Sequence, residues 1–190
     1  MTSVFGTPRR GGVGRWPLFG LTLATLIAGP ALAGTAASAG GGSASTAPAL
    51  PTGGVVQAGS ASIGTASGSS LTVTQTSSRA IINWSGFSIG SGATVQFNNG
   101  SGATLNRVTG SSVSAIDGLL SGTGSVYLIN PNGVIVGKDG VVNVGGTFAA
   151  STLDVANSNF MGGGSLTFSG SSTATVINEG KIGALGATWP

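Results

Sequence analysis

Short β-prone runs, each closed by Gly, Asn or Ser, recur from about Gly53 to the end of this chain. The runs are rich in Val, Ile, Thr and aromatic residues, which favour strands, and the residues between them favour turns. No window of this part shows a helical stripe of useful length. The pattern therefore predicts a domain that is nearly all β. Its clearest predicted strands span residues 70–75, 79–84, 87–89, 94–97, 126–129, 141–144, 165–168 and 175–178.

Two all-β architectures compete for this pattern, a β-sandwich and a parallel β-helix. A sandwich needs polar outer faces on regular hairpins, yet only 6% of the 190 residues are charged. A parallel β-helix pairs each coil with the next, and its corners suit the 36 glycines of the chain. We therefore predict a parallel β-helix, with coils of roughly 20–25 residues and about five or six of them. Residues 53–75 are predicted to cap its N-terminal end, since open sheet edges need cover, and no equivalent cap is evident at the C-terminus.

Two local repeats refine this prediction. The sequence of residues 90–95 is echoed by residues 100–105, which suggests a small antiparallel ribbon. The sequence of residues 132–137 is echoed by residues 139–145, which suggests two successive sides of one coil.

The N-terminus has the pattern of an export signal. Three arginines precede a short apolar stretch, a Gly-Pro break and a small-x-small cleavage site, which together indicate a signal peptide over residues 1–33. Such a segment would engage the inner-membrane export machinery; an N-terminal membrane anchor is the alternative. Residues 34–51 are predicted to be a flexible lead-in, and residues 52–190 to form the β-helix domain. The arginines are Arg9, Arg10 and Arg15; the apolar stretch is residues 18–28, the Gly-Pro break residues 29–30 and the cleavage site residues 31–33.

Charge and residue types exclude several function classes. The net charge of +3 belongs to the N-terminus, because the charges after residue 15 balance, and without a basic patch we expect no nucleic-acid partner. The chain has no His and no Cys, so the usual base, thiolate and soft metal ligands are missing. We therefore expect no catalytic site, no cofactor and no metal.

Four carboxylates remain for any enzymatic hypothesis, and they are scattered along the chain. A β-helix carbohydrate-active enzyme would need at least two of them together on one exposed face. Coil stacking could bring Asp139 near Asp154, although Asp139-Gly140 is more simply a turn. The four residues are Asp117, Asp139, Asp154 and Glu179.

The segment Asn130-Pro131-Asn132-Gly133 is the best specified turn in the chain. Asn at its first position, Pro at its second and Gly at its fourth are the preferences of a type I β-turn. It joins the β-prone runs 125–129 and 134–136. The turn is better specified than a generic connection requires, which makes it a candidate functional element.

Apolar and charged residues near the predicted strands carry further hypotheses. Trp84 and Phe87 are predicted to close a hydrophobic end of the coil stack, with a ligand platform as the alternative. Arg107 could bind a ligand carboxylate, although a lone arginine more often bonds loop carbonyls. Leu105, Val126 and Leu128 are predicted core residues.

Four motifs, in this order and spacing, closely resemble the haemagglutination activity domain. This is the N-terminal secretion domain of filamentous-haemagglutinin-like exoproteins of two-partner secretion systems, and the likeness runs from about Pro51 to Ile182. It implies a right-handed parallel β-helix with an N-terminal cap and an extra-helical antiparallel ribbon. The motifs are Asn83-Trp84-x-x-Phe87-x-Ile89-Gly90, Leu105-Asn106-Arg107-Val108-Thr109-Gly110, Gly124-x-Val126-Tyr127-Leu128-Ile129-Asn130-Pro131-Asn132-Gly133 and Phe148-Ala149-Ala150-Ser151-Thr152-Leu153-Asp154.

The resemblance also implies a function and its residues. It implies an export signal, recognised in the periplasm by soluble modules of a cognate outer-membrane β-barrel transporter and folded at the cell surface. Asn83, Asn130, Pro131, Asn132 and Gly133 match family motif positions and are candidates for transporter recognition or fold nucleation. A surface adhesin that binds a host glycan or protein is the alternative. Family members usually continue into long repeat regions, so we expect this chain to be truncated at its C-terminus.

Overall fold

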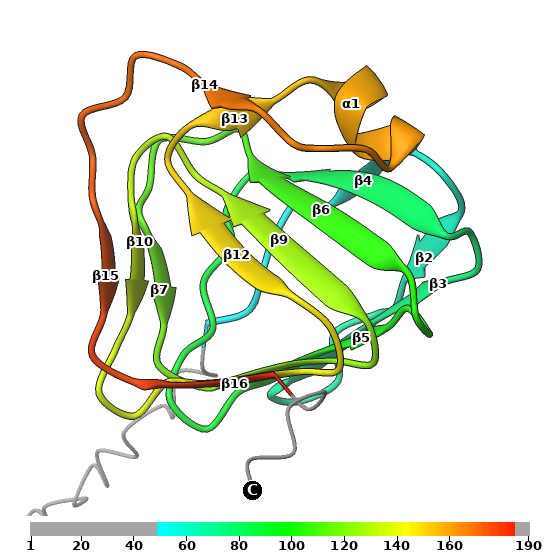
Figure 1. The fold of residues 1–190 in the computed structure, drawn as a ribbon. Coiled ribbons are helices and arrows are strands. Elements are labelled where there is room, and N and C mark those ends of the chain that lie inside the picture. The colour runs from blue at the N-terminus through cyan, green and yellow to red at the C-terminus, as the bar shows by residue number, and fades with distance from the viewer. Residues whose placement is uncertain (1–48, 185–190) are drawn as a thin grey trace, which may run out of the picture. The chain divides into compact units, whose positions relative to one another are not determined.

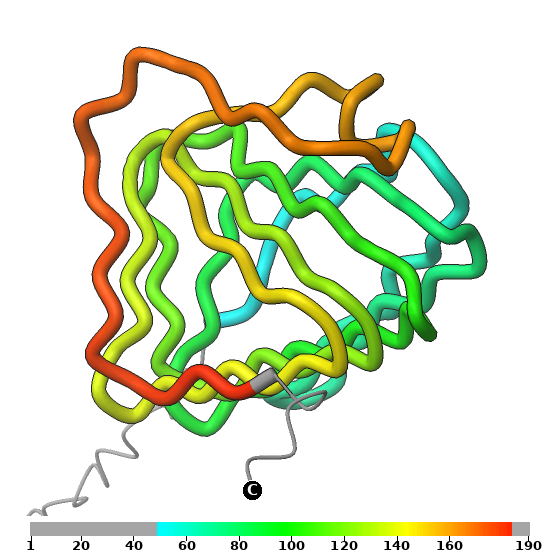
Figure 2. The backbone as a smooth tube through the Cα atoms, in the orientation of Figure 1, coloured from blue at the N-terminus to red at the C-terminus, as the bar shows by residue number. Residues whose placement is uncertain are grey.

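Residues 49–184, which the computed structural model describes, wind into a parallel β-helix of about three turns (Figure 1). The tube in Figure 2 shows the successive coils running side by side. The predicted fold class is confirmed. The predicted signal peptide, residues 1–33, lies outside the described residues, and no helix within 49–184 has the length and apolar character needed to cross a membrane.

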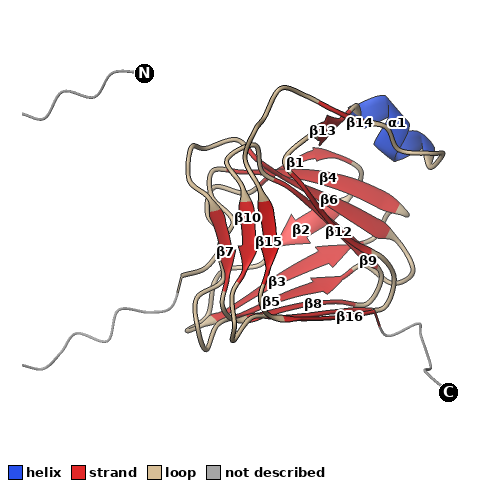
Figure 3. Ribbon diagram, turned by 60° about the vertical axis from the view of Figure 1, so that its left-hand side comes forward, coloured by secondary structure: helices blue, strands red, loops and turns tan. Residues whose placement is uncertain are grey.

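Three sheets form the faces of the β-helix (Figure 3). The six-stranded sheet contains β2 (Ala61–Ile63), β3 (Ser70–Gln75), β5 (Thr94–Asn98), β8 (Leu119–Gly122), β11 (Val141–Val144) and β16 (Lys181–Ala184). The five-stranded sheet contains β1 (Val55–Ala58), β4 (Arg79–Trp84), β6 (Ala103–Val108), β9 (Ser125–Ile129) and β12 (Phe148–Ser151). The three-stranded sheet contains β7 (Ser114–Ile116), β10 (Val134–Val136) and β15 (Val176–Asn178).

Each coil visits the three faces in the same order, and equivalent strands of successive coils pair in parallel. Val95 of β5 pairs with Leu71 in the coil before and with Leu120 in the coil after. The coils are therefore about 22–25 residues long, as expected for this class of repeat. The repeats 132–137 and 139–145 lie on β10 and β11, which are successive sides of one coil as the sequence suggested.

Strand alternation builds the core inside the coils. Along β5, Val95 and Phe97 are fully buried while Gln96 is exposed, because successive side chains of a strand point to opposite faces. The inward residues of all three faces join in one hydrophobic cluster. Four of the five residues predicted to form the core or cap belong to this cluster and are at most 1% exposed: Trp84, Phe87, Val126 and Leu128. The fifth, Leu105, is fully buried in a second cluster on the outer side of the five-stranded sheet.

Antiparallel strands close the N-terminal end. β1 pairs antiparallel with β4, and β2 pairs antiparallel with β3, so both cover edges of the first coil. β3 is itself part of that coil, so the cap is shorter than the predicted residues 53–75. This cap satisfies backbone groups that an open edge would leave unpaired.

The coil count differs from the prediction because a long segment leaves the helix. Residues 152–175, here called the strap, run outside the coils between β12 and β15, so that Val176 stacks on Val134 only after this excursion. The prediction of five or six coils was wrong because it counted the strap and the cap as coil residues. The strap contains β13 (Asp154–Val155), α1 (Asn157–Gly162) and β14 (Phe168–Ser169).

Some local predictions fail, both in the strap and in the first coils. β13 and β14 pair antiparallel and form the extra-helical ribbon that the resemblance implied. The ribbon suggested by residues 90–95 and 100–105 does not exist, because those residues lead into β5 and β6 on different faces. The predicted strand 165–168 contributes only Phe168 to β14, α1 was not predicted, and residues 87–89 supply a lone bridge from Ile89 to Ile116.

Glycine is required at the corners because backbone stacks directly on backbone there. A Cβ on Gly124 would collide with the carbonyl oxygen of Gly102 in the coil before, and one on Gly146 would collide with Ser125. At another corner, Gly118, Gly140 and Gly180 stack on one another's loops in the same way, and a Cβ on any of them would collide with a backbone carbonyl oxygen. Close approach to a neighbouring coil, rather than turn conformation, explains much of the high glycine content.

Replacement of a corner glycine should destabilise the fold. We expect Gly124→Ala to lower the free energy of unfolding by about 1–3 kcal/mol, because the clash is with backbone that must shift. Urea unfolding followed by circular dichroism measures this. Gly164→Ala is the matched control, since its Cβ would meet nothing within 4 Å; it should stay within about 0.5 kcal/mol of the parent. Equal stabilities for the two variants would contradict the role of close stacking.

Candidate functional site: the turn at residues 130–133

The segment Asn130-Pro131-Asn132-Gly133 forms the corner between β9 and β10. The Gly133 N–H donates to the Asn130 carbonyl oxygen at 3.0 Å, the i to i+3 bond of a β-turn. The Asn132 N–H donates to Asn130 Oδ1 at 2.9 Å, which adds the local side-chain bond that Asn supplies in turns. Gly133 has φ of 115°, a value that favours glycine. The predicted turn is therefore present, closed by side chain as well as backbone.

The Asn130 side chain is fully buried and fully hydrogen-bonded. It is 0% exposed, and its Nδ2 donates to the Ser112 carbonyl oxygen and to Ser114 Oγ, both at 2.9 Å. Its backbone N–H donates to the Ser151 carbonyl oxygen in the next coil at 2.9 Å. One residue thus bonds the corner of the coil before and the end of β12 in the coil after.

Asn132 and Pro131 extend these contacts in both directions. Asn132 Nδ2 donates to the Gly110 carbonyl oxygen of the coil before at 2.8 Å. The Pro131 carbonyl oxygen accepts a bond from Ser172 Oγ of the strap at 2.7 Å, while the Pro131 ring is exposed. The turn therefore links three layers: the coil before it, its own coil, and the chain that returns from the strap.

Asn83, the other predicted recognition residue, lies apart from this turn. It is on β4, in register with Arg107 and then Ile129, so two strand spacings separate it from the residue before the turn. Its Nδ2 donates to Gln57 Oε1 of β1 at 3.0 Å, and its Oδ1 is buried without a hydrogen-bond partner among the described residues. The structure does not bring the two predicted sites together.

A second corner uses an asparagine that the sequence reasoning missed. Asn99, 4% exposed, accepts the Gly124 N–H at its Oδ1 at 2.7 Å and donates from Nδ2 to the Ser125 carbonyl oxygen at 2.9 Å. Its Nδ2 also meets Thr104 Oγ1, which in turn donates to Gln75 Oε1. The Asn-Asn-Gly run at residues 98–100, directly after a predicted strand, was the available signal.

Trp84 and Phe87 form a packed pair and not an exposed platform. Each is 1% exposed, and their ring centroids lie 5.6 Å apart in an edge-to-face arrangement. Trp84 Nε1 donates to the buried Asn106 Oδ1 at 3.0 Å, which satisfies its only polar atom. Neither ring is available to stack on a ligand.

Arg107 binds the strap. Its Nε donates to Asp154 Oδ1 at 2.9 Å, its Nη1 to Asn157 Oδ1 at 3.0 Å and its Nη2 to the Val155 carbonyl oxygen at 2.9 Å. The hypothesis that Arg107 bonds a loop carbonyl agrees with its bond to Val155, whereas the carboxylate that it bonds belongs to Asp154 of the same chain and not to a ligand.

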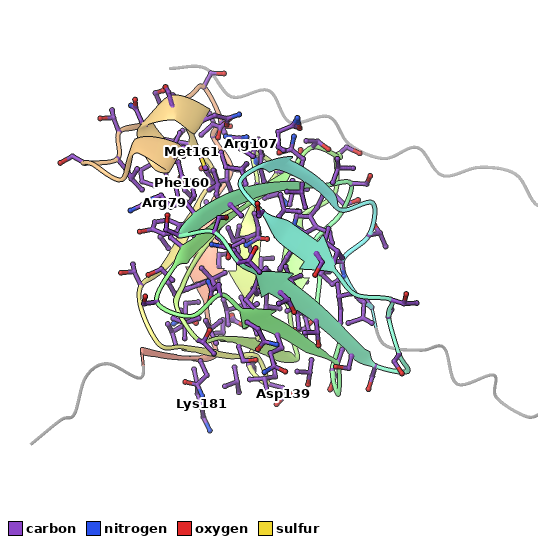
Figure 4. All side chains as sticks on the ribbon, turned by 90° about the vertical axis from the view of Figure 1, so that its right-hand side faces the viewer. Arg79, Arg107, Asp139, Phe160, Met161 and Lys181 are labelled. Atoms are coloured by element: carbon purple, nitrogen blue, oxygen red, sulfur yellow. The ribbon has the colours of Figure 1, made fainter. Side chains whose placement is uncertain are left out.

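Three of the four described carboxylates lie at one corner of the β-helix, because each directly precedes a glycine of the stacked set Gly118, Gly140 and Gly180; these carboxylates are Asp117, Asp139 and Glu179. Asp139 lies in the turn 137–140, whose Gly140 N–H donates to the Gly137 carbonyl oxygen, while Asp154 pairs with Arg107 in the strap. Figure 4 shows Asp139 and Arg107 at opposite ends of the view. Within residues 49–184 there is no group of three or more Asp, Glu, His or Cys placed to hold a metal ion.

Comparison with known proteins gives this arrangement a context. The chain is 35% identical over 136 residues to a heme/hemopexin-binding protein of Haemophilus influenzae, a match that covers 70% of this chain and 15% of that protein. A second heme/hemopexin-binding protein of Haemophilus influenzae is 41% identical over 83 residues, or 43% of this chain and 9% of the relative. This chain thus spans only a small part of these relatives.

A solved structure agrees in fold and in sequence. The crystal structure of the HMW1 secretion domain from Haemophilus influenzae superposes with a TM-score of 0.63 at 36% identity, covering 70% of this chain and 36% of that one. The family model described as the TPS secretion domain, where TPS denotes two-partner secretion, matches residues 47–188. It describes secretion domains of exoproteins and not a family of enzymes. The predicted secretion-signal module is confirmed, and the chain belongs to the family of two-partner secretion domains.

Proposed function

We propose that this domain delivers its exoprotein from the periplasm to a cognate outer-membrane β-barrel transporter and folds as a β-helix at the cell surface. Membership of the TPS secretion-domain family supports the proposal. The composition suits passage of an unfolded chain through a narrow pore, because there are no disulfides to reduce and few charges to move. The predicted signal peptide would carry the chain across the inner membrane first.

The burial of Asn130 supports a folding role for the turn. A side chain that is 0% exposed with its donors and acceptors engaged offers nothing to a transporter once the coil has formed. We propose that the transporter modules bind the chain before this turn closes, and that Asn130 and Asn132 then lock their own coil onto the coil before it. Asn83 has a related role in this proposal, since it bonds the first coil to its cap.

We do not assign the heme and hemopexin binding of the relatives to this chain. The two relatives are named for binding heme and hemopexin, but the matched region covers only 15% and 9% of their lengths. Direct binding of a host glycan or protein remains the alternative function, and the buried Trp84 and Phe87 remove its aromatic platform.

Dependence on a transporter is the first test. The full chain, expressed in a Gram-negative host with the candidate transporter, should appear in the medium or on the cell surface and fold there. Without the transporter, or with a transporter that lacks its periplasmic modules, we expect it to stay in the periplasm, as measured by fractionation and immunoblotting. Equal export with and without the transporter would contradict the proposal.

Substitution of Asn130 is the second test. In the purified protein, Asn130→Ala should lower the free energy of unfolding by about 1–3 kcal/mol, because buried partners including Ser112 O and Ser114 Oγ lose their bonds. Asn143→Ala is the matched control, since the Asn143 side chain makes no hydrogen bond to another described residue and should leave stability nearly unchanged. Chemical denaturation of both variants measures the difference.

The same variants separate folding from recognition. Asn130→Ala, diluted from urea onto the isolated periplasmic modules, should bind within twofold of the parent chain if the turn acts in folding. A tenfold loss of binding with unchanged stability would show instead that the transporter reads this asparagine directly.

A further inference from the structure

The strap is attached to the β-helix by few contacts. Of residues 152–175, only Val155 and Phe160 are buried, and most of the others are exposed. Its helix α1 has six residues and no side-chain cap at Ala156, and its β13–β14 ladder pairs only two residues on each side. Isolated elements of this size are marginal in water, so the strap depends on the surface beneath it.

That surface is the outer face of the five-stranded sheet. Phe160 and Val155 pack there in a second hydrophobic cluster with Ile81, Leu105 and Ile129, separate from the core inside the coils. The Phe160 ring meets Tyr127 edge-to-face at 5.4 Å and has the Arg79 guanidinium 5.2 Å from its centroid. Figure 4 shows Arg79 and Arg107 of the sheet in the same part of the molecule as Phe160 and Met161 of the strap.

Three successive coils contribute to this landing surface. Ile81 comes from β4, Leu105 from β6 and Ile129 from β9. A one-residue slip of β9 would turn Tyr127 and Ile129 inward and present core residues outward, because side chains alternate along a strand. The complete surface therefore exists only when the three coils are stacked in register.

Arg107 makes the polar attachment. Its fork reaches Asp154, Asn157 and the Val155 carbonyl oxygen together, and its side chain is only 15% exposed. A lysine at this position would keep the charge but could not make three bonds in this planar geometry. The other described charges outside this region, including Lys138 and Asp139, form no ion pair within residues 49–184.

We propose that the strap is a latch that opens independently of the coils and closes only on coils stacked in register, with Arg107 as the residue that holds it shut. Its opening exposes the apolar strip of Ile81, Leu105 and Ile129 while the core inside the coils stays closed. Weakly attached units of this kind open below the free energy of global unfolding. The proposal concerns the folded domain and is independent of which transporter it uses.

Hydrogen exchange of the purified full chain tests the latch. With Arg107→Lys, backbone amides of residues 153–169 should exchange at least tenfold faster, while those of β6 and β9 change less than twofold. Phe160→Ala should act in the same direction more strongly, because it removes the buried anchor. Lys138→Gln, which removes a charge from an exposed turn, is the control and should change neither region.

Limited chymotrypsin digestion gives a second readout. The strap holds Phe160, Met161, Leu166 and Phe168 as cleavage sites, so Arg107→Lys should be cut there first and leave the coils resistant. Two results would overturn the proposal. One is exchange that becomes faster in the strap and in the coils to the same degree in both Arg107→Lys and Phe160→Ala; the other is unchanged exchange of the strap in Arg107→Lys.

Discussion

Stacking of backbone on backbone at about the 4.8 Å strand spacing is the constraint on which the rest of this structure depends. Each coil must follow the one before it closely enough for parallel pairing along all three faces. At the corners this leaves no room for a Cβ, so Gly102, Gly124 and Gly146 recur there. The same repetition carries the inward apolar residues into one continuous core.

Buried asparagine side chains provide hydrogen-bond partners for the backbone groups at the corners. Corners interrupt the strand pairing, and the backbone groups left there still need partners. Asn130 at one corner and Asn99 at another supply a donor and an acceptor from one short side chain, and each bonds to the backbone of a neighbouring coil. The turn that stood out in the sequence is thus one example of a general solution, distinguished by its links to the strap.

Regular parts of the fold were predictable from the sequence, and the irregular part was not. The strands 70–75, 79–84 and 141–144 were identified residue for residue. Strands 70–75 and 141–144 alternate because one face is buried, whereas 79–84, which is buried on both faces, is marked by its β-branched residues. The turn at residues 130–133 followed from residue preferences alone. The strap escaped, because its helix is short and uncapped and its strands pair only two residues, so contacts with other coils decide its structure. The partners of Arg107 and the separation between Asn83 and Asn130 likewise depend on which residues stack on one another. Sequence spacing alone does not determine the stacking.

The strap also gives this domain a mechanical character. In a β-helix the hydrogen bonds between coils run along the axis, so a pull on the C-terminal end loads one coil at a time and peels β16 and then β15 from their neighbours. The strap is next along the chain and is bound across strands of three coils at once. Because the strap is weakly attached, we expect it to detach next and to expose Ile81, Leu105 and Ile129 before β12 and β9 separate.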